Sequence, residues 1–241
     1  MYGTDAEEKL FPSKLLENKL QSFGIYGTIT VKPGERKKTD MAKRSFEGAV
    51  IMAPLPCVMV SSGTLEKPNV MTVAWTGIVN THPAKTYISV RKSRYSYELI
   101  TKSREFVINL VPSTLVRACD FCGVRSGRTI DKFKACSLTP EASEAVSAPA
   151  IAECPLQLEC RVSEIIPLGT HDMILADIVK MRVSEDIIDD CGKFRLDKAG
   201  LLAYMHGNYY TLGKKIGSFG YSVKKKKKPA AAQRQKKSGK N

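Results

Sequence analysis

The chain has 241 residues and a formal net charge of +14, but this charge is uneven: residues 224–241 contribute +9, residues 1–44 contribute +3, and 45–223 contribute only +2. The basic character therefore belongs to the two ends, and it gives no reason to assign nucleic-acid binding to the middle of the chain. Seven cysteines spread over this length are too few, and odd in number, for a disulfide-dense secreted scaffold, so most are expected to be reduced.

The N-terminal arm is expected to contain a short helix over 13–20 and an extended piece over 24–31. Acidic residues occupy the place of a basic n-region and no apolar h-region follows, so no signal peptide is predicted. The longest apolar run, 49–60, is interrupted by two prolines and is too short to span a bilayer. Together these features predict a cytoplasmic protein.

Beyond the arm, most of the expected elements are strands. The pattern predicts strands over 57–61, 70–75, 86–91, 106–111, 156–163 and 172–184, and helices over 93–102, capped by Ser93, and from Pro112 to about Gly123. The alternation over 156–163 is the clearest signal of a half-buried strand, and 172–184 is its expected antiparallel partner. Because strands dominate and do not alternate with helices, a closed or partly closed antiparallel barrel is favoured over a doubly wound sheet. One domain is expected over 45–223, with an extension over 1–44 and a disordered basic tail over 224–241.

Short hydroxyl and guanidinium side chains surround the expected start of the first helix. Ser89, Arg91, Ser93, Arg94 and Ser96 lie where a strand ends and that helix begins. Unpaired backbone amides at a helix N-terminus, with nearby arginines and hydroxyls, form a suitable site for a phosphate. The alternative is an ordinary capped helix with surface arginines.

A second candidate feature is the strand from Met71 to Trp75, where small Ala74 would let a flat ring approach the backbone. The alternative is that the single tryptophan anchors the core. The loop segments Ser126-Gly127-Arg128 and Asp131-Lys132-Phe133 supply backbone donors and a lysine that could close such a site, although alone they read as a polar loop.

Two further motifs, one with a histidine and one with two cysteines, indicate a chemical role less specifically. His171, in Gly169-Thr170-His171, is placed to contact a flavin, to hold a nicotinamide or to make a structural hydrogen bond. The other histidines lack ligands at metal-binding spacing, so no metal site is predicted. Cys119 and Cys122 have the spacing of a redox pair, but they end a helix instead of opening one after a strand.

The order of these motifs resembles the flavin reductase-like FMN-binding split-barrel family, and particularly its flavoredoxin branch, over residues 50–223. The resemblance rests on Pro-Leu-Pro-Cys57, 69–75, 89–97, 106–109, Asp-Lys-Phe133, 154–160, Gly-Thr-His171 and 204–213. Many reductases of the family carry Gly-Asp-His at the position of Gly169-Thr170-His171. The resemblance implies a six-stranded antiparallel Greek-key split barrel that forms a homodimer, with one FMN per subunit near the subunit boundary.

The resemblance also implies the ligand-binding residues. Those expected around the ring are Met71, Thr72, Val73, Ala74 and Trp75; those around the ribityl phosphate are Ser89, Arg91, Ser93, Arg94, Tyr95 and Ser96; and those completing the site are Ser126, Gly127 and Lys132. His171 is the expected catalytic residue.

Three functions are compatible with the sequence. The first is an oxidoreductase that passes hydride or electrons from NAD(P)H or a protein donor through FMN to an acceptor. The second is a non-catalytic FMN electron carrier that exchanges electrons only with redox protein partners. The third is a polyanion-binding module acting through the basic tail, in which lysines are concentrated without aromatic residues; the alternative for this run is a solvated tail.

Overall fold

The computed structural model describes residues 43–224. The chain divides into two units, Met1–Ala53 and Pro54–Asn241. The described part of the first unit, 43–53, contains no helix or strand, and every element below belongs to the second. The helix expected over 13–20, the extended piece over 24–31 and all but the first residue of the basic tail lie outside the described residues.

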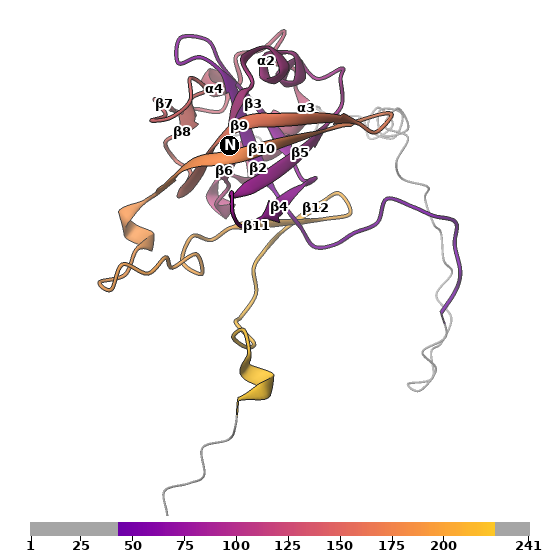
Figure 1. Cartoon of the computed structure of the whole chain (residues 1–241), viewed down its shortest axis with the longest axis vertical. Helices are drawn as coiled ribbons and strands as arrows, with labels where there is room; N and C mark the ends of the chain where they lie inside the picture. The colour runs from indigo at the N-terminus through magenta and orange to yellow at the C-terminus, as the bar shows by residue number, and fades with distance from the viewer. Residues whose placement is uncertain (1–42, 225–241) are drawn as a thin grey trace, which may run out of the picture. The chain divides into compact units, whose positions relative to one another are not determined.

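The second unit is built on one antiparallel sheet of seven strands in the order β3-β2-β6-β9-β10-β5-β4 (Figure 1). Its strands are β2 (Val58–Gly63), β3 (Pro68–Val73), β4 (Thr76–Asn80), β5 (Lys85–Val90), β6 (Glu105–Leu110), β9 (Leu156–Pro167) and β10 (Asp172–Val183). All six pairings are antiparallel, including the expected pairing of β9 with β10. The predicted antiparallel barrel is thus confirmed, with one more strand than the six expected.

The connection between β3 and β4 explains the extra strand. These strands are consecutive in the chain but occupy opposite edges of the sheet, so the sheet must curl to bring its edges together. Ala74 and Trp75 form the bend between them, and the Trp75 carbonyl accepts a hydrogen bond from the Ser89 backbone amide at 2.9 Å. The expectation of one strand over 70–75 was therefore wrong in its last two residues, and β4 was missed.

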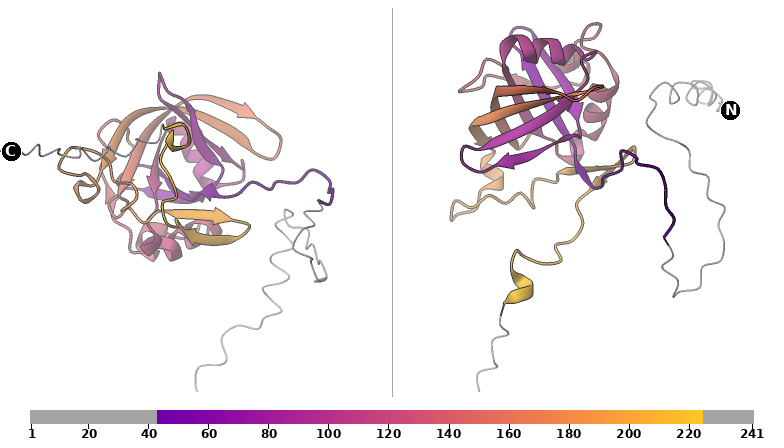
Figure 2. Two further views of the ribbon diagram at one scale, coloured as in Figure 1. Left: turned by 90° about the horizontal axis from the view of Figure 1, so that it is seen from below. Right: turned by 45° about the vertical axis from the view of Figure 1, so that its right-hand side comes forward.

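Helices are few and short, as expected. They are α2 (Tyr95–Ser103), the 3-10 turn η1 (Ser113–Leu115), α3 (Val116–Val124) and α4 (Lys132–Ala135). Of these, α2, α3 and α4 all contact β3, and Figure 2 shows short helices packed beside the sheet. The expected Ser93 cap was wrong, because α2 begins after Arg94 and has no side-chain cap. The short α4 was not expected; the Asp131 carboxylate caps it by accepting the Lys134 amide at 3.1 Å.

Two large apolar clusters hold the barrel, and a small third one packs Val107 of β6 against Val146, Ala148 and Ala150. One of the large clusters fills the barrel interior with alternate residues of the strands, including Val60, Ile88 and Phe106. The other large cluster packs the outer face of β2 and β3 against α3 and α4 and includes Met59, Val70 and Phe133. Strands with both faces covered explain why β2 is buried over five consecutive residues.

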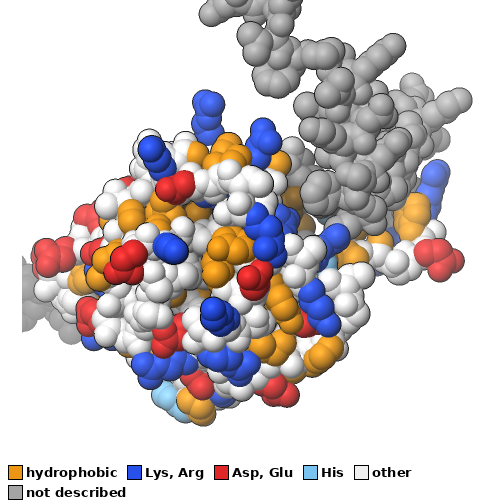
Figure 3. Space-filling view, turned by 90° about the horizontal axis from the view of Figure 1, so that it is seen from above, with side chains coloured by type: hydrophobic (Ala, Val, Ile, Leu, Met, Phe, Trp, Pro, Cys, Tyr) orange, Lys and Arg blue, Asp and Glu red, His pale blue; other side chains and the backbone are white. Residues whose placement is uncertain are grey.

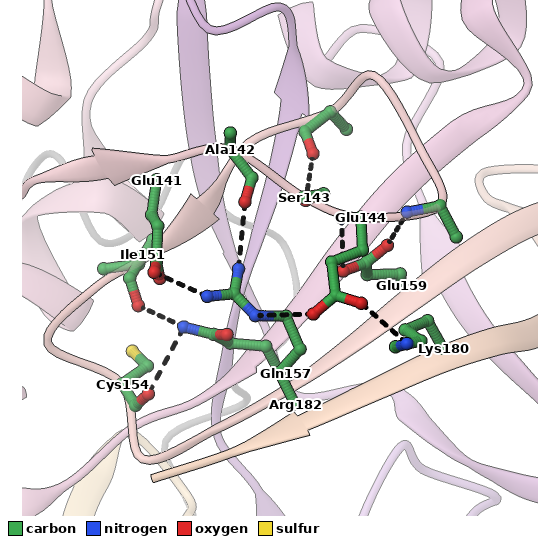
Figure 4. Close-up of polar contacts among 12 residues, drawn as sticks. Glu141, Ala142, Ser143, Glu144, Ile151, Cys154, Gln157, Glu159, Lys180 and Arg182 are labelled. Atoms are coloured by element: carbon green, nitrogen blue, oxygen red, sulfur yellow. Dashed lines mark hydrogen bonds and ion pairs between the residues drawn. The ribbon is translucent and has the colours of Figure 1, made fainter.

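The alternation in β9 did not predict burial correctly. A half-buried strand over 156–163 would leave its polar face in solvent, yet Gln157 and Glu159 on that face are buried under the segment that carries β7 (Pro140–Glu141) and β8 (Ala150–Ile151). Figure 4 shows the cause. Glu159 accepts the backbone amides of Glu144 and Ala145 at 3.0 and 2.6 Å, and the Gln157 amide donates to the Ile151 carbonyl at 2.8 Å.

The remaining elements do not belong to the seven-stranded sheet. They are the small antiparallel sheet of β1 (Leu55–Pro56), β11 (Leu202–Met205) and β12 (Asn208–Thr211), and the 3-10 turns η2 (Glu185–Ile187) and η3 (Tyr221–Val223). Within 43–224, no helix is long and apolar enough to cross a membrane.

Candidate functional site

Asn69, the second residue of β3, joins three of the segments that the sequence singled out. Its side-chain amide donates to Ser96 Oγ on α2 at 2.7 Å and to Ser62 Oγ on β2 at 3.2 Å, and the residue is only 5% exposed. The start of α2 is therefore fixed against β3. Ser96, expected at the phosphate, is buried and engaged in this contact.

The loop after α3, which contains Gly127, lies close to Asn69 and to the start of α2. A Cβ added to Gly127 would lie 2.0 Å from Asn69 Oδ1 and 3.1 Å from Tyr95 Cδ1. No side chain fits in that space, so glycine is what lets the loop approach β3 and α2. Arg128, the next residue, pairs with Glu98 at 2.9 Å and lies over the Tyr95 ring at 5.1 Å from its centroid. The expected loop residues thus reach the expected helix start.

Two cations share the space behind this loop. The Arg94 guanidinium donates to the Gly123 carbonyl at 2.9 Å, and Lys132 Nζ donates to the carbonyls of Cys122 and Arg125 at 3.1 and 3.2 Å. Burial lowers the pKa of both groups, and their mutual repulsion lowers that of Lys132 further. Among the described residues, neither cation takes part in an ion pair.

Positive charge without an acidic partner is unusual at such burial, since Lys132 is 4% exposed. Elsewhere in the described chain, seven basic side chains do form ion pairs; Lys92, for example, lies 3.5 Å from Asp172. Figure 3 likewise shows acidic side chains among the basic ones on the face seen from above. The paired cations are therefore a specific local feature and suit an anionic ligand.

An aromatic wall stands at the bend between β3 and β4. The rings of Trp75 and His171 lie 4.7 Å apart at an interplanar angle of 44°. Burial, followed by the positive charges of Arg91 and Arg94, lowers the pKa of His171. The imidazole is consequently neutral at neutral pH and close to both arginines, which connects the β10 side of the site with the α2 side.

The other expected residues divide by burial. Met71 and Val73 pack in the barrel core, so their backbone groups alone are available to a ligand, whereas Thr72, Ala74 and Ser89 are half-buried. Thr72 Oγ1 donates to the Cys119 carbonyl on α3. The exposed residues of the expected set are Ser93 and Ser126.

Three residues that organise the site were not among those expected. Asn69 holds α2 to β3, Gly123 accepts from Arg94 and packs on Thr72, and Asp172 accepts from Tyr97 Oη at 2.6 Å. Asp172 is 2% exposed, and its Oδ1 has no hydrogen-bond partner within 43–224. Among the described residues, the carboxylate has one ion-pair partner, the Lys92 ammonium, whose Nζ lies 3.5 Å from Oδ1. Asn69 opens the segment 69–75 and Gly123 ends the second expected helix, but neither they nor Asp172 carry a pattern that predicts these contacts.

The comparisons with known proteins agree with this geometry. The model of the flavin reductase like domain matches residues 52–213, two thirds of the chain. The chain belongs to the flavin reductase-like family. An uncharacterized protein of Archaeoglobus fulgidus is 34% identical over 126 residues, which are 52% of this chain and 71% of that protein.

Two other members bear more specific names. The solved flavoredoxin of Desulfovibrio vulgaris is similar to this flavin reductase-like chain with a TM-score of 0.71 and 28% identity, over 76% of this chain and all of that one. A protein named NADPH-flavin oxidoreductase in Streptomyces viridifaciens is 24% identical over 62% of this chain and 77% of its own. The barrel is therefore the split barrel of flavoredoxins and flavin reductases.

Proposed function

We propose that this flavin reductase-like protein binds FMN and passes electrons or hydride from NAD(P)H or a protein donor to an acceptor. The observation that carries the proposal is the pair of cations beside the first turn of α2, the buried Lys132 and the half-buried Arg94, neither of which has an acidic partner among the described residues. A phosphate would neutralise both and accept from backbone amides at the start of that helix.

The remaining site features fit a flavin in the same way. Thr72, Ala74 and Trp75 offer backbone groups and a half-buried edge for the polar side of the ring, and Gly127 brings the loop close enough to cover it. When bound, FMN supplies the redox chemistry, while the chain sets its orientation and access. In this proposal His171, neutral and in contact with Trp75, hydrogen-bonds the ligand without adding charge.

An absorbance spectrum tests the proposal directly. Purified protein mixed with FMN and separated from free ligand is expected to retain the yellow flavin bands. Titration with FMN and with riboflavin should show weaker binding of riboflavin, because riboflavin lacks the phosphate. Protein that stays colourless after FMN addition would exclude this function.

A second candidate is the electron carrier, in which the flavin exchanges electrons with proteins only. It is supported by the similarity to flavoredoxin and by Thr170, where many reductases carry an acid. Anaerobic addition of NADPH or NADH separates the two functions. Rapid bleaching of the bound flavin identifies a reductase, and a flavin that bleaches only with dithionite identifies a carrier.

A further inference from the structure

Five of the seven cysteines meet in one place, on the outer face of the barrel under α3. Cys57, Cys119, Cys122 and Cys154 are buried in that apolar cluster, and Cys136 packs against it. Within 43–224 no group of three or more potential ligands is arranged to hold a metal ion. Another explanation for this gathering of thiols is therefore needed.

The sulfur contacts do not follow the Cys-x-x-Cys spacing. Cys57 Sγ lies 3.3 Å from Cys119 Sγ, and Cys122 Sγ lies 4.0 Å from Cys136 Sγ. Each cysteine of the motif thus faces a partner from a distant segment. The separation of the Cys57 and Cys119 sulfurs exceeds the roughly 2.05 Å of a disulfide bond by about 1.2 Å. Small side-chain rotations can close that difference.

We propose that Cys57 and Cys119 form a reversible dithiol–disulfide site that reacts with peroxides. The two residues are separated by 62 positions and belong to different elements, since Cys57 directly precedes β2 and Cys119 lies in α3. The crosslink would join β2 to α3. Carbonyls of α3 accept the hydrogen bonds that Thr72 and Arg94 donate.

The two sulfurs differ in their surroundings. Cys57 directly follows the exposed Pro56, whereas Cys119 is 0% exposed within α3. We therefore assign Cys57 as the attacking sulfur, because a peroxide reaches it first, and Cys119 as the resolving one.

The reaction balances with a hydroperoxide as the oxidant. Cys57 loses its thiol proton, and the thiolate attacks one oxygen of hydrogen peroxide. The O–O bond breaks, the sulfenic acid forms, and the leaving hydroxide takes up that proton to give water. The Cys119 sulfur then attacks the sulfenic sulfur, the S–O bond breaks, and a second water leaves. Two thiols and one hydrogen peroxide give one disulfide and two waters.

Access to Cys57 depends on a thin cover. The residue before it, Pro56, is exposed and ends β1, a strand of two residues paired only to β11. Proline has no amide hydrogen, so this pairing is weak. Local opening of so small a sheet exposes the sulfur without unfolding the barrel.

Peptide mapping after oxidation tests the proposal. The flavin-free protein would be treated with hydrogen peroxide under native conditions, alkylated and digested without reductant. We expect a Cys57–Cys119 crosslinked peptide, the loss of two titratable thiols, and their recovery with dithiothreitol. Seven unchanged thiols, or a map dominated by Cys119–Cys122 or Cys122–Cys136, would overturn the proposal.

Two variants and two controls sharpen the test. Cys57→Ser should slow thiol loss by about tenfold or more, because the attacking sulfur is gone, and Cys119→Ser should leave a sulfenic acid that a dimedone probe labels. The controls Cys160→Ser, buried inside the barrel, and the exposed Cys191→Ser should oxidise like the wild type. Equal rates in Cys57→Ser and the controls would also overturn it. Since no flavin takes part, failure here would leave the proposed function intact.

Discussion

Arg94 and Lys132 show how individual residues point to a ligand. A buried cation without an acid is costly, and two that repel each other cost more. Three backbone carbonyls accept from them, which keeps the protonated forms in place but leaves their net charge uncompensated. The protein bears this cost at the one place where the sequence also predicted a phosphate.

Replacing Arg94 with methionine should therefore weaken FMN binding selectively. Loss of a charge-assisted hydrogen bond of about 1.5–3 kcal/mol corresponds to a roughly 10- to 150-fold rise in the FMN dissociation constant. Riboflavin binding should change by less than about twofold, and fluorescence titration measures both ligands. Arg117→Met removes the same charge from an exposed position on α3 and serves as the control. Equal weakening of FMN and riboflavin would contradict the assignment of Arg94 to the phosphate.

His171 gives the flavin-free protein a defined pH dependence. Its pKa is lowered in the folded state, so the unfolded chain takes up the proton first as the pH falls. The resulting stability is complete above about pH 6.5 and is lost as the pH decreases through the folded-state pKa. Urea unfolding at pH 7.5 and 5.5 should show a larger fall for the wild type than for His171→Asn. Equal falls would show that burial and the arginines do not act on this group.

Among the elements, the segment around β7 and β8 is held by buried charge. Glu159 on β9 is completely buried and receives two backbone amides, while Arg182 on β10 contacts Glu141 and the Ala142 carbonyl (Figure 4). Charge-assisted bonds of this kind supplement the small apolar cluster of Val107, Val146, Ala148 and Ala150, through which the same segment packs on the sheet.

Glu159→Gln should consequently destabilise the protein. One amide would lose its acceptor and the other would gain a weaker one, which predicts a decrease of about 1–3 kcal/mol in the free energy of unfolding. Denaturant titration measures this decrease. Glu164→Gln, an exposed change on the same strand, should stay within about 0.5 kcal/mol of the wild type. A neutral Glu159→Gln would mean that this segment is not anchored through the carboxylate.

The loop after α3 gives a second prediction at this scale. In Gly127→Ala the new methyl group would meet Asn69 Oδ1, so the loop must move away from β3 and α2. We expect FMN affinity to fall at least about tenfold, with a loss of about 1–3 kcal/mol in stability from the forced shift. Isothermal titration and thermal unfolding measure the two effects. Gly213→Ala meets no atom within 4 Å and should be neutral; an equally neutral Gly127→Ala would refute the close approach.

Elements with a local signal were predicted well from the sequence, and those set by tertiary contacts were not. The β9–β10 hairpin and α3 follow from periodicity and turn residues. The burial of Glu159 depends on a distant segment, and the bend at Trp75 depends on the closure of the barrel. In the candidate site the ligand roles of the basic and glycine residues stay predictions, whereas the contact of Asn69 with α2 was not predicted because a buried amide has no pattern of its own.

At the scale of the whole molecule, the homodimer stays a prediction. The described C-terminal segment after β12 carries large apolar side chains in contact with solvent, and Ile216 and Phe219 are almost fully exposed. Exposed apolar side chains in a row mark an interaction surface. Sedimentation equilibrium should give a mass of two chains, and Phe219→Ser should shift the equilibrium toward monomer. Monomeric wild-type protein at micromolar concentration would contradict this expectation.

The bend at Trp75 has an optical consequence. This residue is the single tryptophan of the chain, and it stands at once where the two sheet edges meet and where an aromatic wall faces the candidate site. Intrinsic fluorescence excited at the indole therefore reports on one spot only. A bound isoalloxazine ring would quench that emission, and separation of the two sheet edges at Trp75 would shift it to the red. Both changes would be measured on the same unlabelled sample.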